Sequence, residues 1–214
     1  MWQSSAGGSK PRQTGPVTDY GALPDDLPAP IDDGAADHLP GTWLTNVALD
    51  ATDGSTVNLA ALGSGVTVLY VYPLTARPGT DQPAGWDAIP GARGCTPEAC
   101  AFRDHHADLL NAGATAVHGI SSQTTDYQRE VVERLHLPFT MLADPGFLLA
   151  DALGLPTFTA DGRRLYRRLT MLVRDGAVEH VFYPVFPPDQ HALQVLQHLA
   201  RADGLTGSSP NPLD

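Results

Sequence analysis

Two cysteines, Cys95 and Cys100, are the residues of this chain best suited to chemistry. Cys95 follows an apolar run at residues 66–72 and stands two positions before Pro97, and proline suits the first turn of a helix. The spacing therefore predicts that Cys95 lies at a helix N-terminus, where unpaired N–H groups and the positive end of the helix dipole stabilise an anion. We expect a thiolate with a lowered pKa, which is a usable nucleophile near neutral pH.

The spacing of the two cysteines determines whether they can form a bridge. Five positions turn about 140° around a helix and rise about 7.5 Å, which exceeds the ~7 Å that a disulfide spans between Cα atoms. A Cys95–Cys100 disulfide would therefore require the first helical turn to unwind, so it would act as a switch. The alternative is two inert, buried cysteines in one helix; the strand-to-helix junction and Pro97 favour the reactive interpretation.

Elements around the cysteines alternate between strand and helix. We expect a hairpin at residues 43–49 and 55–59, and buried strands at 66–72 and 114–120. The remaining elements are helices at 97–111, 125–136 (capped by Thr125), 147–153 and 190–202, and strands at 139–142, 165–173 and 177–183, the last two joined by a turn at Asp175-Gly176. The order predicts an α/β protein with a thioredoxin-like fold and a mixed central sheet flanked by helices.

Composition excludes several classes of protein. Of the 214 residues, 24 are acidic and 13 basic, so the net charge of −11 disfavours nucleic acids and anionic membranes as partners. No apolar run approaches the ~20 residues of a membrane span. The first residues lack the apolar core of a secretory signal, and we expect a cytoplasmic protein. Two cysteines and scattered histidines predict neither a metal site nor a bound cofactor.

Glycine and proline are concentrated near the N-terminus. Residues 1–40 contain five Gly and six Pro, and we interpret them as an extended arm of which the first 25 or so are mobile. Residues 41–203 form the predicted domain, and residues 204–214 form a short tail.

The segment GCTPEACAFRD, residues 94–104, resembles the active-site helix of the peroxiredoxins, most closely the bacterioferritin-comigratory (PrxQ) type with its pattern P-G-C-T-x-E-A-C-x-F-R-D. The resemblance extends over about residues 42–200. It includes Tyr72-Pro73, Gly119-Ile120-Ser121, Leu137-Pro138-Phe139, Leu142-Ala143-Asp144 and the run from Arg168 to Leu172.

The resemblance implies a mechanism. Cys95 would attack the terminal oxygen of a peroxide and become a sulfenic acid, and Cys100 would condense with it to a disulfide that thioredoxin or a similar dithiol reduces. Arg168 matches the arginine that holds the thiolate and polarises the peroxide. Without the resemblance, Arg168 would be interpreted as one of four arginines on a surface strand. Pro73 would keep the role of the family's proline.

One departure affects the catalytic loop. The family reads P-x-x-x-T-x-x-C, but here Ala88 and Ala92 stand at the Pro and Thr positions. Cys95 lies 22 positions after Pro73 instead of seven, which places an insertion of 15 residues within 74–94. We expect Thr75 to supply the missing catalytic hydroxyl. The alternatives are Thr80 and Thr96; Arg77 and Arg93 could also face the pocket, and Trp86 could cover it, or the loop could be a surface ornament.

The predicted function is a thioredoxin-dependent peroxiredoxin that reduces hydrogen peroxide and organic hydroperoxides. One rival is a thiol–disulfide oxidoreductase that has lost peroxide specificity through its altered loop. Another is a redox-sensing module whose helix melts on oxidation and exposes a partner surface. We expect a monomer or a weak homodimer.

Overall fold

A computed structural model describes residues 23, 24 and 26–206. It describes only the backbone of residues 203–206. Most of the predicted mobile arm and residues 207–214 of the predicted tail lie outside the described residues. The seven-stranded sheet has the order β2-β1-β5-β4-β3-β8-β9. Its strands are β1 (Ala48–Ala51), β2 (Thr56–Asn58), β3 (Val66–Val71), β4 (Ala114–Ser121), β5 (Met141–Ala143), β8 (Leu169–Arg174) and β9 (Ala177–Phe182).

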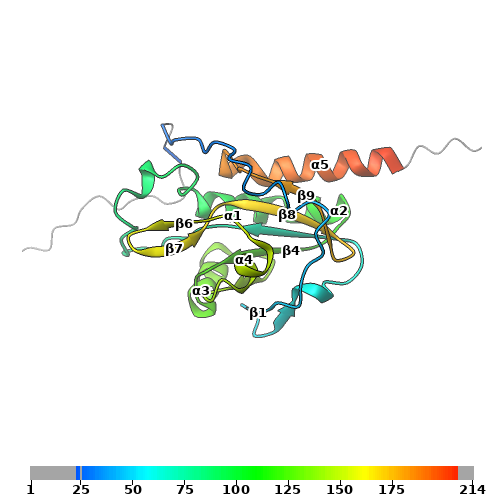
Figure 1. The fold of residues 1–214 in the computed structure, drawn as a ribbon, viewed down its shortest axis with the longest axis horizontal. Helices are drawn as coiled ribbons and strands as arrows, with labels where there is room; N and C mark the ends of the chain where they lie inside the picture. The colour runs from blue at the N-terminus through cyan, green and yellow to red at the C-terminus, as the bar shows by residue number, and fades with distance from the viewer. Residues whose placement is uncertain (1–22, 25, 207–214) are drawn as a thin grey trace, which may run out of the picture.

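The helices are connected as the alternating pattern predicts, and β3, β4 and β5 pair in parallel. The chain forms α1 (Cys95–Asp104), α2 (His106–Asn111), α3 (Thr125–Leu135), α4 (Leu148–Leu153) and α5 (His191–Thr206). In Figure 1, α5 runs above the sheet and α4 lies below it. This is the mixed sheet flanked by helices that the sequence predicts.

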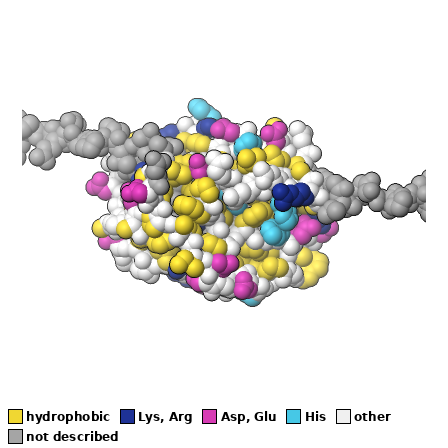
Figure 2. Space-filling view, turned by 90° about the horizontal axis from the view of Figure 1, so that it is seen from above, with side chains coloured by type: hydrophobic (Ala, Val, Ile, Leu, Met, Phe, Trp, Pro, Cys, Tyr) yellow, Lys and Arg dark blue, Asp and Glu magenta, His cyan; other side chains and the backbone are white. Residues whose placement is uncertain are grey.

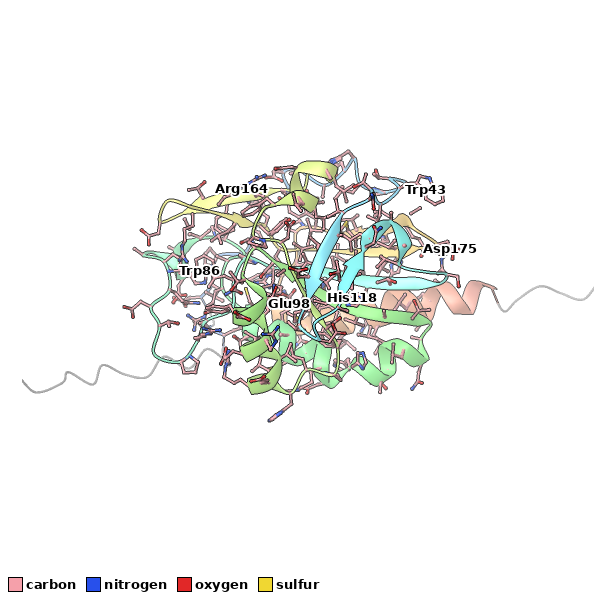
Figure 3. All side chains as sticks on the ribbon, turned by 90° about the horizontal axis from the view of Figure 1, so that it is seen from below. Trp43, Trp86, Glu98, His118, Arg164 and Asp175 are labelled. Carbon is pink, nitrogen blue, oxygen red and sulfur yellow. The ribbon has the colours of Figure 1, made fainter. Side chains whose placement is uncertain are left out.

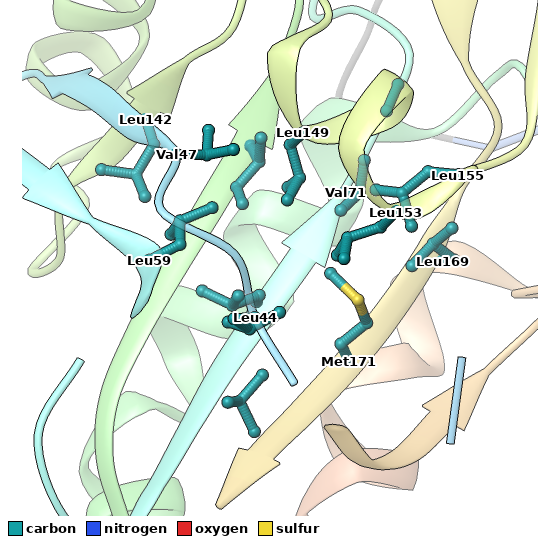
Figure 4. Packing of buried hydrophobic residues seen from close by; sticks show 14 of the residues in the cluster. Leu44, Val47, Leu59, Val71, Leu142, Leu149, Leu153, Leu155, Leu169 and Met171 are labelled. Carbon is teal, nitrogen blue, oxygen red and sulfur yellow. The ribbon is translucent and has the colours of Figure 1, made fainter. Parts of the chain in front are cut away.

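Strand alternation divides the core into two layers. In β3, Val68 and Tyr70 face a cluster that includes residues of α1, α3 and α5, whereas Leu69 and Val71 face a cluster built with α4 and the β1–β2 hairpin. Figure 4 shows this second cluster, in which Leu149 and Leu153 of α4 lie near Val71, Leu169 and Met171. Burial of both faces explains why residues 66–72 read as a continuous apolar run.

A glycine on β4 lets the central aromatic residue pack. Gly119 pairs with Tyr70 of β3 in the parallel register. A Cβ at Gly119 would lie 2.6 Å from Cζ of Tyr70 and 2.5 Å from Cε of Met141. The absent side chain therefore provides the space in which the Tyr70 ring stacks on Phe102 of α1, with 4.3 Å between ring centroids. This contact fixes α1 against the sheet.

Four local predictions are corrected by the structure. The expected strand at 165–173 is two strands, because β7 (Arg163–Tyr166) pairs with β6 (Thr157–Ala160) in a separate two-stranded sheet. The expected helix at 97–111 is interrupted at His105, where φ is −100° and ψ is 8°. Thr124, not Thr125, caps α3 by accepting from the Tyr127 N–H. Helix α5 continues to Thr206, beyond the expected end at 202.

Candidate active site

Three chain segments meet at one end of the sheet. β3 and β8 are antiparallel neighbours in which Val71 is opposite Leu169. The residues just beyond this pair, Pro73 after β3 and Arg168 before β8, therefore lie at the same sheet end. Cys95 is the first residue of α1, the helix that follows β3 in the chain. The register thus places the predicted nucleophile beside the predicted arginine.

The N-cap of α1 requires a glycine. Gly94 has φ of 104°, which L side chains rarely adopt, and it has no side-chain cap. A Cβ there would also lie only 2.3 Å from Cγ of Pro188, in the short 3-10 helix Pro188–Gln190 that precedes α5. The backbone thus turns sharply at Gly94 under the Pro188 ring, and this turn delivers the Cys95 sulfur to the sheet.

The Cys95 sulfur is held by a guanidinium and by the loop before it. Arg168 donates from Nη2 to Sγ at 3.2 Å, and the thiol is 3.6 Å from the carbonyl oxygen of Ala92. The same Nη2 donates to the carbonyl oxygens of Ala92 and Arg93 at 3.3 and 3.2 Å. Cys95 and Arg168 are each 3% exposed. The guanidinium therefore links the loop, the sulfur and β8.

Glu98 completes the cluster. Sequence reasoning did not predict that this carboxylate would pair with Arg168. Its Oε2 accepts from Nη1 of Arg168, and both side chains are buried. Figure 3 labels Glu98 in the interior of the molecule. Among the described residues, Glu98 Oε1 and Arg168 Nε are buried without a hydrogen-bond partner. The available signal was the spacing: Glu98 is three positions after Cys95, so both lie on one helix face.

The expectation of a lowered Cys95 pKa is wrong for this closed arrangement. Burial raises the pKa of the Cys95 thiol, and the Glu98 carboxylate acts in the same direction, while Arg168 and the backbone N–H of Leu74 lower it. Burial also raises the pKa of Glu98 to about 7 against the pull of Arg168. The sequence revealed the helix terminus but not the removal of water, which disfavours any charged form.

Cys100 lies further along the same intact helix. It is half-buried, packs against the cluster beneath α1, and burial raises the pKa of its thiol. Both cysteines are free thiols. They are the first and sixth residues of α1, so the five-residue spacing applies to a regular helix and a bridge between them requires the first turn to open.

Thr75 is close in the chain to Pro73 but has another partner. Pro73 is buried where β3 ends. The Thr75 hydroxyl donates to Oε1 of Gln123 at 3.0 Å, and the Thr75 backbone exchanges two more hydrogen bonds with the same amide. The structure therefore anchors Thr75 to the loop before α3. Its proposed catalytic hydroxyl role stays a prediction.

The loop residues Arg77 and Thr80 also have partners other than the sulfur. Arg77 stacks over the ring of Tyr127 at 3.9 Å and pairs with Glu130 on α3, and Thr80 bonds to the Arg77 backbone. Thr96 is buried in the first turn of α1. The contacts of Arg77 join the loop to α3.

Arg93 and Trp86 support the loop from inside. Arg93 bonds to Gln82 and Asp87, and its carbonyl accepts from Arg168. Trp86, labelled in Figure 3, is 3% exposed and packs with Leu74 and Ala92 in a small hydrophobic cluster. The loop of residues 74–94 is therefore packed into the domain at both ends and through Trp86, whereas residues 78–81 are exposed.

The described residues contain no group of three or more His, Cys, Asp or Glu side chains placed to hold a metal ion. Within the same part of the chain, no helix combines the length and apolar character needed to cross a membrane.

Comparison with known proteins identifies the family. A sequence model of the Redoxin family matches residues 37–196. Peroxiredoxin Q, chloroplastic, of Triticum aestivum is 31% identical over 165 residues, covering 74% of this chain and 67% of its own. Peroxiredoxin Q, chloroplastic, of Arabidopsis thaliana is 30% identical over 165 residues, covering 76% of this chain and 67% of its own.

A solved structure agrees with the sequence relatives. The crystal structure of Peroxidoxin BcpB from Mycobacterium tuberculosis has a TM-score of 0.61 and 26% identity, covering 77% of this chain and 98% of that chain. The chain therefore belongs to the redoxin family, as a PrxQ-like peroxiredoxin with a thioredoxin-like fold.

Proposed function

We propose that this thiol-dependent peroxidase uses Cys95 as its peroxidatic residue and Cys100 as its resolving residue. The observation that carries the assignment is the 3.2 Å contact between Arg168 Nη2 and Cys95 Sγ. A fixed guanidinium beside a sulfur favours the thiolate, and it stabilises the negative charge that moves onto the leaving oxygen.

In the first step the Cys95 thiolate attacks the terminal oxygen of ROOH. The O–O bond breaks, the leaving alkoxide takes a proton and departs as ROH, and the sulfur becomes a sulfenic acid. Within the described part of the chain, Arg168 Nε has no hydrogen-bond partner, so it can donate to a peroxide oxygen. Glu98, whose pKa is about 7, is partly protonated near neutral pH, and in that form it leaves more of the guanidinium charge to the sulfur.

In the second step the Cys100 sulfur attacks the Cys95 sulfenic acid. The new S–S bond releases the sulfenic oxygen as water, and both sulfurs share the oxidation. Because the cysteines are five positions apart in α1, the first helical turn opens for this step. An external dithiol then reduces the bridge by thiol–disulfide exchange. We propose thioredoxin in this role.

The remaining assignments stay proposals. Pro73 shapes the end of β3 beside the sulfur, and Thr75 keeps its candidate place as the source of a catalytic hydroxyl. A cytoplasmic location and a monomer or weak homodimer are the expected setting.

The test is peroxide consumption coupled to thioredoxin and its reductase. Cys95→Ser should abolish turnover. Cys100→Ser should give one equivalent of sulfenic acid, trapped by dimedone, and then stop. Ala101→Ser, in the same helix, is the matched control and should turn over like the parent. Normal peroxide turnover by both cysteine variants would contradict the mechanism. Disulfide reduction without peroxide consumption by the parent would favour the oxidoreductase rival.

A further inference from the structure

The described N-terminal residues lie against the active-site loop. We call residues 23–33 the strap, with the description starting at Leu23 and omitting residue 25. Figure 1 shows this blue segment passing beside the green loop that leads into α1. Figure 2 looks onto the same face, much of which is formed by hydrophobic side chains.

Two strap side chains contact the backbone of the loop. A Cβ at Gly94 would lie 3.0 Å from Cδ2 of Leu23, so a Leu23 methyl group covers the residue just before Cys95. A Cβ at Gly91 would lie 3.5 Å from Cβ and Cγ of Pro30, so the Pro30 ring covers the backbone that precedes the nucleophile. The strap therefore covers the segment whose carbonyls bind Arg168.

Next to these contacts is a small cavity, which we call the mouth. Its lining includes Pro30 of the strap, Gly91 of the loop and Arg168, together with Pro90, Phe158, Arg167, Tyr183, Pro184 and Val185. Its volume is about 20 Å³, which is room for about one water molecule. Arg168 is the residue that the mouth shares with the catalytic cluster, because it also contacts the Cys95 sulfur, whereas Cys95 itself does not line the cavity. This small size favours hydrogen peroxide over a hydroperoxide with a bulky organic group.

The strap is weakly attached, so it can move. No backbone–backbone hydrogen bond joins the described residues of the strap to the rest of the described chain. It contains Pro24, Pro28 and Pro30, which stiffen an extended chain. At its end Asp33 accepts from the Tyr183 hydroxyl at 2.8 Å, and the following Leu39 is fully buried. The strap is thus anchored at one end and held elsewhere by side-chain packing.

We propose that the strap is a specificity element that narrows the mouth beside Arg168 and limits the size of the hydroperoxide that reaches Cys95. Hydrogen peroxide passes with the strap in place. A bulky hydroperoxide reacts only when Leu27 and Pro30 move away from the loop. Leu27 belongs to the same wall, since it lines a second small cavity with Gly91 and Arg93.

The test compares kcat/KM for hydrogen peroxide and for cumene hydroperoxide in the full chain. Leu27→Ala/Pro30→Ala removes the wall, and the cumene-to-hydrogen-peroxide ratio should rise about tenfold, the discrimination that a methylene-sized obstruction gives. Ile31→Ala is the matched control, because this strap residue is 84% exposed and its ratio should not change. An unchanged ratio in the double variant would overturn the proposal.

A second measurement applies even where the double variant turns over poorly. With Cys100→Ser as background, Cys95 is the only thiol, and its alkylation by iodoacetamide is compared with that by the larger N-pyrenylmaleimide. The strap variant should accelerate the larger reagent selectively. Equal acceleration of both reagents, or none, would show that the strap does not restrict size.

A larger cavity of about 500 Å³ is the competing entrance. It is lined by Leu74, Tyr127 and Arg164 among others, but neither Cys95 nor Arg168 borders it. Arg164→Ala widens it without touching the strap. We expect Arg164→Ala to leave unchanged both the cumene-to-hydrogen-peroxide ratio and the relative rates of the two alkylating reagents. A shift in these ratios for Arg164→Ala, with none in the strap variant, would assign selectivity to the larger cavity instead.

Discussion

Arg168 and Glu98 form a buried ion pair directly beside the Cys95 sulfur. The guanidinium can stabilise negative charge on both the Glu98 carboxylate and the Cys95 sulfur. A stronger interaction with one of them weakens its interaction with the other. This competition adds to burial, which is the main reason why the thiol pKa is raised although an arginine lies 3.2 Å away. It also makes the reactivity of Cys95 dependent on the protonation of Glu98.

Glu98→Gln should make Cys95 reactive at lower pH. The substitution removes the negative charge that raises the Cys95 pKa and keeps an oxygen to accept from Arg168. The pH profile of iodoacetamide alkylation, measured with Cys100→Ser as background, should therefore move to lower pH. Glu133→Gln, an exposed change on α3, should leave the profile in place. A shift to higher pH would contradict the competition for Arg168.

Arg168→Lys should slow peroxide reduction while keeping the charge. A lysine is a single point donor and lacks the planar fork that reaches Glu98, Cys95 and the loop carbonyls together. We expect kcat/KM for hydrogen peroxide to fall by about 10²–10³-fold, the usual loss for one transition-state donor. Arg174→Lys, a change at the other end of β8, should stay near the parent. Equal losses in both variants would argue against a specific role for Arg168.

The strands, the crossovers and the cysteine helix could be predicted from the sequence because each has a local signal. The apolar run of β3, the Gly154 stop of α4 and the spacing of Cys95 and Pro97 are all visible within a few residues. The sequence-based prediction merges β7 with β8 because Arg167 and Arg168 separate them without a glycine or proline, and it overlooks the Asp161-Gly162 turn that joins β6 to β7.

The environment of the sulfur could not be predicted from local signals. Arg168 is 70 positions from Glu98 and 73 from Cys95, so their contacts depend on the β3–β8 register. The helix terminus suggested a lowered thiol pKa, but burial outweighs it, and burial depends on the whole fold. The partner of Thr75, Gln123, lies 48 positions away in another loop.

Thr75→Val separates the structural role of the Thr75 hydroxyl from its proposed catalytic role. The hydroxyl donates to Gln123, so its loss removes one hydrogen bond and costs about 1 kcal/mol in the free energy of unfolding. We expect kcat/KM for peroxide to fall less than in Arg168→Lys. Denaturant unfolding and peroxide assays on Thr75→Val and Thr75→Ser test this. A loss above 100-fold in Val, rescued by Ser at unchanged stability, would establish the catalytic hydroxyl predicted from the sequence.

His191, buried at the start of α5, should make the fold sensitive to acid. Burial lowers its pKa to about 4, and the nearby Arg168 acts in the same direction, while its Nε2 lies 2.7 Å from the Thr170 hydroxyl. On acidification the His191 side chain takes up its proton near pH 6.5 in the unfolded chain. The full contribution of neutral His191 to the free energy of unfolding is therefore present above that pH. It is lost as the pH falls through 4, by roughly 3 kcal/mol in all.

Glu98 acts in the opposite sense over much of the same range. The pKa of Glu98 is raised, so the protonated side chain contributes to the free energy of unfolding below its ordinary pKa near 4.5. This contribution is lost as the pH rises through about 7. The two effects partly cancel in the parent, so the comparison with His191→Gln isolates the histidine. Unfolding by denaturant at pH 7.5, 6 and 4.5 should show the parent losing stability relative to the variant on acidification. Parallel curves for the two proteins would mean that His191 takes up its proton equally in the folded and unfolded states.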